Sequence, residues 1–152
     1  MIQDSVLWVH VATGVVAWIT GAVALWRNMP RRRSRRALAA FTWSVLAVAV
    51  TASVLVAFRP AELWWLWLLA ILSYGLAVLG YLAPRERSLG WLRLGIHGQG
   101  GACIAVVTAT FVVSVDGLTQ VAAWTLPTLV GVPLLELWYR RASVAVTSSA
   151  RQ

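Results

Sequence analysis

Lysine, acidic residues and cysteine are scarce in this sequence, and the motifs of common enzyme sites are missing. Its 152 residues include no lysine, five acidic residues and one cysteine, Cys103, so an intramolecular disulfide is excluded. The sequence has no H-x3-H or C-x2-C spacing for a metal and no glycine-rich phosphate loop after a strand. These absences argue against a conventional catalytic site or metal centre.

Long hydrophobic runs are what the sequence has in abundance. Hydrophobic residues make up 60% of the chain and charged residues 12%, which is more apolar surface than a soluble domain of this size can cover. A run of about 20 apolar residues predicts a membrane-spanning helix, because a helix satisfies its own backbone groups in lipid. The runs are residues 6–26, 37–58, 63–83, 94–115 and 118–138, and only the last contains a charged residue, Glu136.

We therefore predict an all-α fold, a polytopic bundle of five transmembrane helices. One domain covers residues 1–138, and residues 139–152 form a short, basic tail, which we expect to be mobile. The first run has no basic segment before it and no clear cleavage site after it, so it is interpreted as a retained span. Short connections predict that successive helices are antiparallel neighbours.

The arginines fall almost entirely on one side of this bundle. Twelve of the thirteen lie in the first and third connections, near the start of the fourth run, or in the tail, and only Arg59 lies opposite. The positive-inside rule then predicts an outer N-terminus and a cytoplasmic C-terminus in the bacterial inner membrane. The net charge of +8 is thereby explained without nucleic acid. The basic loop is expected to contact anionic lipid through Arg31, Arg32, Arg33, Arg35 and Arg36.

Small residues and prolines predict how the helices pack. His10, Gly14 and Gly21 lie on one face of the first helix, and Gly98 and Gly101 are expected at the closest contact of the fourth. Such faces also allow a homo-oligomer or a place in a larger membrane complex. The fifth run contains Pro127 and Pro133, which predict bends that either leave the helix merely curved or line a cavity.

Four motifs together resemble a family of small bacterial integral membrane proteins of unknown function, over most of the chain. They are HVATGVVAWITGAVAL in the first run, LSYGLAVLGY in the third, HGQGGACIAVVTATFVV in the fourth and WTLPTLVGVPLL in the fifth. The resemblance implies a topology and no established reaction. The family often has a histidine followed by arginine in the first cytoplasmic loop, where this chain reads Ser34 and Arg35. An activity that uses that histidine is not expected here.

Ionisable side chains inside spans are costly and mark functional sites, and here they are His10, His97 and Glu136. His10 is predicted near the outer interface, where water is available. On the cytoplasmic side, His97 and Glu136 are expected to face each other. Gln99, Tyr81 and Arg93 complete this predicted cluster. It is interpreted either as a cavity for a proton, an ion or a lipid head group, or as an interhelical hydrogen-bond network that only stabilises the bundle.

Two membrane histidines suggest a bis-histidine haem, but their depths argue against it. In straight helices His10 and His97 lie roughly 20 Å apart along the membrane normal, too far for one iron. The sequence therefore favours a bundle that binds or moves a small hydrophobic or protonatable ligand. The alternatives are an electron-transfer subunit with quinone or a single-histidine haem, and an accessory subunit of a larger complex.

Overall fold

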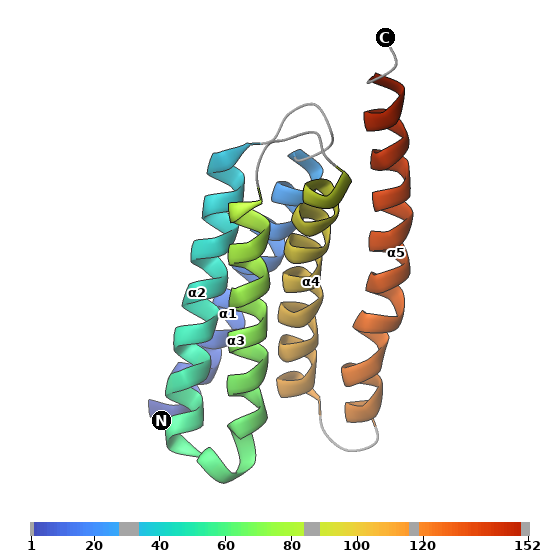
Figure 1. Cartoon of the computed structure of the whole chain (residues 1–152). Coiled ribbons are helices and arrows are strands. Elements are labelled where there is room, and N and C mark those ends of the chain that lie inside the picture. The colour runs from blue at the N-terminus through green and yellow to red at the C-terminus, as the bar shows by residue number, and fades with distance from the viewer. Residues whose placement is uncertain (1, 28–33, 84–88, 116–118, 150–152) are drawn as a thin grey trace.

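The chain forms five α-helices, which confirms the all-α prediction (Figure 1). A computed structural model describes residues 2–27, 34–83, 89–115 and 119–149, and these contain no strand. Each helix is long and apolar enough to cross a membrane, as expected of a multi-pass membrane protein. The helices are α1 (Ile2–Arg27), α2 (Arg35–Phe58), α3 (Pro60–Leu82), α4 (Leu89–Ser114) and α5 (Thr119–Ser149).

Local sequence explains the helix ends. The Ser34 side chain accepts a hydrogen bond from the backbone N–H of Ala37 and so caps α2. Only Arg59 separates α2 from α3, and Pro60 at the first position of α3 suits the start of a helix. Residues 139–149, predicted as a mobile tail, instead continue α5. This stretch lacks glycine and proline, and Ala142 is buried.

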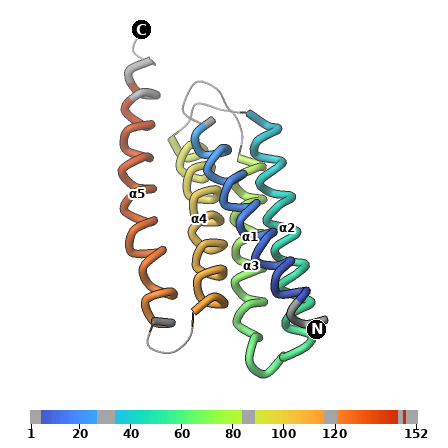
Figure 2. Tube along the Cα trace, turned by 180° about the vertical axis from the view of Figure 1, so that it is seen from behind, coloured from blue at the N-terminus to red at the C-terminus, as the bar shows by residue number. Residues whose placement is uncertain are grey.

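Four helices form a closed bundle, and the fifth lies outside it (Figures 1 and 2). In the described residues α1 packs on α2, α2 on α3, α3 on α4, and α4 back on α1. Among the described residues, the backbone of α5 comes close to that of α4 alone. The helix stays continuous through Pro127 and Pro133, and its course bends in this part. The interior of the four-helix bundle is filled by side chains such as Phe41, Val45 and Val106.

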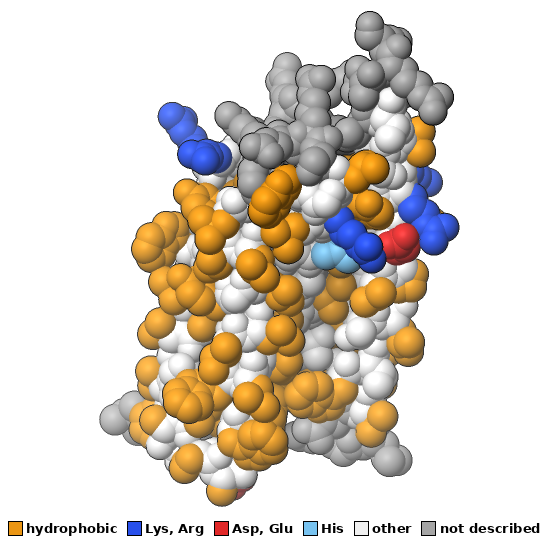
Figure 3. Space-filling view, viewed as in Figure 1, with side chains coloured by type: hydrophobic (Ala, Val, Ile, Leu, Met, Phe, Trp, Pro, Cys, Tyr) orange, Lys and Arg blue, Asp and Glu red, His pale blue; other side chains and the backbone are white. Residues whose placement is uncertain are grey.

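The outer surface is apolar along most of the bundle, and charges gather toward one end (Figure 3). At this end, which we call the arginine end, α2 and α4 begin and α5 finishes. The described arginine side chains there are Arg35, Arg36, Arg93, Arg140 and Arg141. Arg59 lies at the opposite end and forms an ion pair of 3.3 Å with Glu62.

The contact between α3 and α4 is made by backbone against backbone. A Cβ atom at Gly98 would lie 2.8 Å from the Gly80 nitrogen and 3.0 Å from the Leu76 carbonyl oxygen. Gly80 meets the backbone of Gln99 in the same way. Lipid provides no hydrophobic driving force for helices to associate. Dispersion contacts of this kind therefore hold membrane helices together. Gly101, predicted at the same contact, also faces α3, where its Cβ atom would lie 3.2 Å from the side chain of Leu76.

Two glycines of α3 provide a matched test of this contact. Replacing Gly80 by alanine should lower the free energy of unfolding by about 1–3 kcal/mol, because the neighbouring backbone must move. At Gly75 the added methyl group meets no atom within 4 Å, so Gly75→Ala should be neutral or slightly stabilising. Unfolding of both variants by SDS in mixed micelles measures the difference. Equal stability of the two variants would show that the α3–α4 contact is loose.

Candidate functional site

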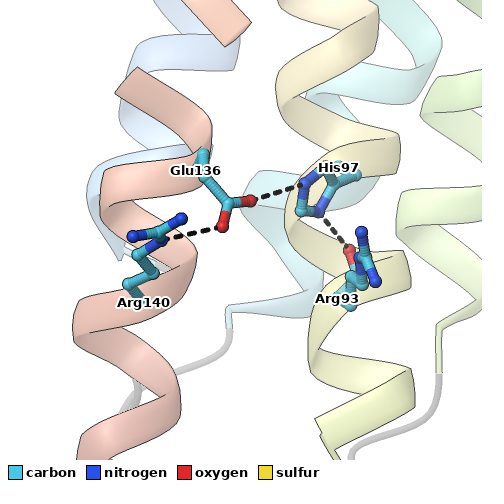
Figure 4. A network of polar contacts seen from close by, with 4 residues as sticks. All are labelled: Arg93, His97, Glu136 and Arg140. Carbon is cyan, nitrogen blue, oxygen red and sulfur yellow. Dashed lines mark hydrogen bonds and ion pairs between the residues drawn. The ribbon is translucent and has the colours of Figure 1, made fainter. Parts of the chain in front are cut away.

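A histidine of α4 and a glutamate of α5 meet near the arginine end (Figure 4). The Nε2 atom of His97 lies 3.8 Å from Oε2 of Glu136. The other carboxylate oxygen, Oε1, accepts a hydrogen bond of 2.9 Å from Nε of Arg140, one turn further along α5. The close approach of the two helices makes this possible, because Gly100 of α4 leaves room for Leu135 of α5.

The ring orientation of His97 is fixed by its own helix. Its Nδ1 atom lies 2.9 Å from the carbonyl oxygen of Arg93, and since a carbonyl can only accept, Nδ1 must carry the hydrogen. Nε2 is then the atom that gains or loses a proton. In the neutral ring, Nε2 faces the Glu136 carboxylate as an unprotonated hydrogen-bond acceptor. In the cationic ring, Nε2 carries a hydrogen and can donate it to that carboxylate. The pair is therefore an ion pair only when the imidazole is protonated.

Tyr139 and Arg140 complete the cluster and were not predicted from the sequence. The rings of His97 and Tyr139 lie 5.7 Å apart, edge to face, and the Arg93 guanidinium carbon lies 5.9 Å from the centre of the Tyr139 ring. Both residues follow Glu136 at spacings of three and four in α5. That spacing places them on the same helix face, a signal that the sequence did contain. We call the following five residues the His97 cluster: Arg93, His97, Glu136, Tyr139 and Arg140.

Two residues predicted for the cluster lie elsewhere. Gln99 is buried on the side of α4 that packs against Gly80 of α3, because two residues along a helix turn the side chain to a different face. Tyr81 of α3 is 38% exposed. Among the described residues, the polar contacts of His97 and Glu136 are with each other, with Arg93 and with Arg140, and not with Tyr81. The structure thus brings together three of the five predicted residues: His97, Glu136 and Arg93.

An apolar groove leads away from the His97 cluster between α3, α4 and α5. It has a volume of about 310 Å³, within the range of sites for small molecules. His97 lies at one end of the groove and Trp124 and Thr108 lie at the other, so it extends about 16 Å along α4. Apart from His97, its walls are leucine, isoleucine, valine, alanine, glycine, threonine and tryptophan. At that end the rings of Trp124 and Trp65 of α3 pack edge to face, with 5.0 Å between their centres.

His10, expected at a watery interface, lies in the bundle core and is only 2% exposed. Its Nδ1 atom is 2.8 Å from the hydroxyl of Thr51 on α2. That hydroxyl donates to the carbonyl oxygen of Ala47 or Val48, so it accepts from the histidine. A cavity of about 10 Å³ beside the ring has room for about one water. His10 belongs to the packing of α1 against α2.

The positions of the two histidines disfavour a shared haem. Val106 and Ala109 line the cavity beside His10, and they follow His97 in α4 by roughly 14 and 18 Å of helix. His10 reaches toward α2, whereas His97 reaches toward α5.

The two glycines of α1 that were predicted for helix packing lie against side chains of neighbouring helices. Gly14 lies against Thr110, and Gly21 lies against Cys103 and Phe41.

In the part of the chain that the structure describes, no three histidine, cysteine or acidic side chains are grouped as metal ligands would be. Comparison of the chain with protein-family models, with curated proteins and with solved structures gave no match. The chemistry of the chain must therefore be inferred from the His97 cluster and its groove.

The two histidines should respond differently to alanine substitution. His10→Ala removes a buried hydrogen bond and leaves a cavity, so we expect a loss of about 2–4 kcal/mol in the free energy of unfolding. His97→Ala should cost much less, because the side chain is 38% exposed and its contact with Glu136 is long. Unfolding in mixed micelles compares the two variants. A larger loss for His97→Ala would identify the His97 cluster as structural.

Proposed function

We propose that the chain is a multi-pass protein of the bacterial inner membrane that binds a small amphiphile in the α3–α4–α5 groove. The ligand has one apolar chain and a head group with an oxygen acceptor, such as a carboxylic acid or a quinone. The observation that carries this proposal is the position of a single ionisable side chain, His97, at the end of an apolar groove. Sites for small molecules have this composition: mostly apolar walls and a few placed polar groups.

The groove suits a ligand that arrives from the lipid. The backbones of α3 and α5 do not come close to each other in the described residues, and the Trp65–Trp124 contact bridges them at one end. Between that contact and His97, the groove is open toward the surroundings of the bundle (Figure 3). A chain of apolar carbons therefore enters sideways from the bilayer, and only its head group needs a polar partner.

His97 links ligand binding to a proton. A head-group oxygen accepts a hydrogen bond only from the protonated Nε2, and it then competes with Glu136 for that hydrogen. A ligand that accepts this hydrogen thus replaces Glu136 as the partner of Nε2, and ligand release restores the His97–Glu136 contact. This exchange is the simplest way in which the bundle could bind or move a protonatable ligand.

Filling the groove at an exposed position should block the ligand without disturbing the core. Thr128 lines the groove and Thr125, one turn earlier on α5, does not, although both are exposed. Thr128→Trp should weaken binding of palmitate or decylubiquinone at least about tenfold, whereas Thr125→Trp should bind as the parent does. His97→Ala removes one hydrogen bond and should weaken binding about threefold to tenfold. Equilibrium dialysis in detergent measures these affinities, and equal binding by both tryptophan variants would refute the groove as the site.

The orientation of the bundle is part of the proposal. The arginine end carries five described arginines against one at the other end, which supports a cytoplasmic position for it. Arg35 and Arg36 are exposed there and are proposed to contact anionic lipid, while Arg31, Arg32 and Arg33 lie outside the described residues.

Reporter fusions test this orientation. A fluorescent protein fused after Gln152 should be bright, because it folds in the cytoplasm, and alkaline phosphatase at the same place should be inactive. Inserted at Arg59, between α2 and α3, the two reporters should give the opposite result. An active phosphatase at the C-terminus would reverse the orientation and place the His97 cluster on the outer side.

A further inference from the structure

A second groove lies between α1 and α5, also at the arginine end. It has a volume of about 470 Å³, and its lining includes Leu25 and Trp26 of α1 and Leu134, Leu137, Trp138 and Arg141 of α5. It exists because α1 and α5 both pack on α4 and their backbones do not come close to each other in the described residues. None of its lining residues belongs to the His97 cluster or to the α3–α4–α5 groove.

The lining residues follow a polar-to-apolar order along the groove. On α5, Arg141 lies nearest the C-terminal end of the helix, Trp138 lies one turn before it, and Leu134 lies one turn before that. Trp26 occupies the matching end of α1 and is 78% exposed. A cationic group, then tryptophans, then aliphatic side chains is the order in which a lipid presents its phosphate, its ester region and its acyl chains.

The charge of Arg141 is available to such a ligand. Arg140 already donates to Glu136, whereas Arg141 has no carboxylate partner among the residues that the structure describes. Arg35 and Arg36 at the same end add positive potential. This potential favours a lipid with net negative charge over a zwitterionic one, whose ammonium group it repels.

We infer that the α1–α5 groove binds an anionic phospholipid, with the phosphate at Arg141 and an acyl chain between α1 and α5 beside Leu134 and Leu137. A guanidinium suits this role because it holds phosphate oxygens in a planar, two-pronged geometry. The lipid would fill the space left by the missing α1–α5 contact and so hold α5 in place. This site is independent of the proposed amphiphile in the other groove.

Native mass spectrometry of the full chain, released from micelles with equal amounts of phosphatidylglycerol and phosphatidylcholine, tests this inference. The parent should carry one preferred phosphatidylglycerol molecule. Arg141→Gln should reduce that adduct at least threefold. Ala22→Trp, at an exposed position that lines the groove, should remove bound lipid of both kinds. Arg36→Gln, which removes an exposed arginine of the same end outside the groove, lowers only the general positive potential and should reduce the adduct much less than Arg141→Gln does.

Three results would overturn the inference. An equal loss of adduct in Arg36→Gln and Arg141→Gln would show a diffuse effect of charge rather than a site. Equal binding of the two lipids by the parent would remove the anionic preference. A lipid-free dimer that Ala22→Trp dissociates would show that a second copy of the chain fills the groove.

Discussion

Close backbone packing of α4 is the constraint on which the rest of the structure depends. Lipid tails are as apolar as leucine side chains, so helices in a bilayer associate through close packing and interhelical polar contacts rather than through a hydrophobic driving force. The helix α4 provides this through glycines and alanines on several faces. In its apolar 18-residue stretch 56% of the residues are buried, against 6% in that of α5. Helix α4 contacts α1 and α3 on two sides, and in the part of the chain that the structure describes it is the only helix whose backbone comes close to α5.

This central role of α4 accounts for both grooves. Because α5 is held by one neighbour, through pairs such as Gly100 with Leu135 and Gly131 with Ile104, it stands away from α3 on one side and from α1 on the other. Each gap becomes a groove along the bundle. If α5 also packed on α3 or on α1, one of these two grooves would be closed. The attachment of α5 to a single neighbour is thus the physical origin of the surfaces to which we assign ligands.

The two histidines illustrate how packing sorts chemically identical groups. His10 is enclosed by the four-helix bundle, where its ring has a hydroxyl partner and little space. His97 lies at the edge of that bundle, where its Nε2 faces a carboxylate and its side chain lines a groove. A buried and satisfied histidine stabilises a fold, whereas one that can exchange partners at a groove can bind or move a proton.

The sequence by itself determined the number of helices, their approximate ends apart from the C-terminal end of α5, and the end of the bundle at which arginines gather, because these depend on local hydrophobicity and charge. It also placed His97 opposite Glu136, since both lie near the same end of neighbouring helices. It misplaced Gln99, although helical spacing puts this residue on a different face of α4 from His97. It did not include Arg140, although helical spacing puts this residue on the same face of α5 as Glu136. Only the tertiary structure decided that His10 is buried, that α5 has one neighbour and that two grooves result. Helical periodicity defines the faces of a single helix, but which faces meet depends on the shapes of all the helices together.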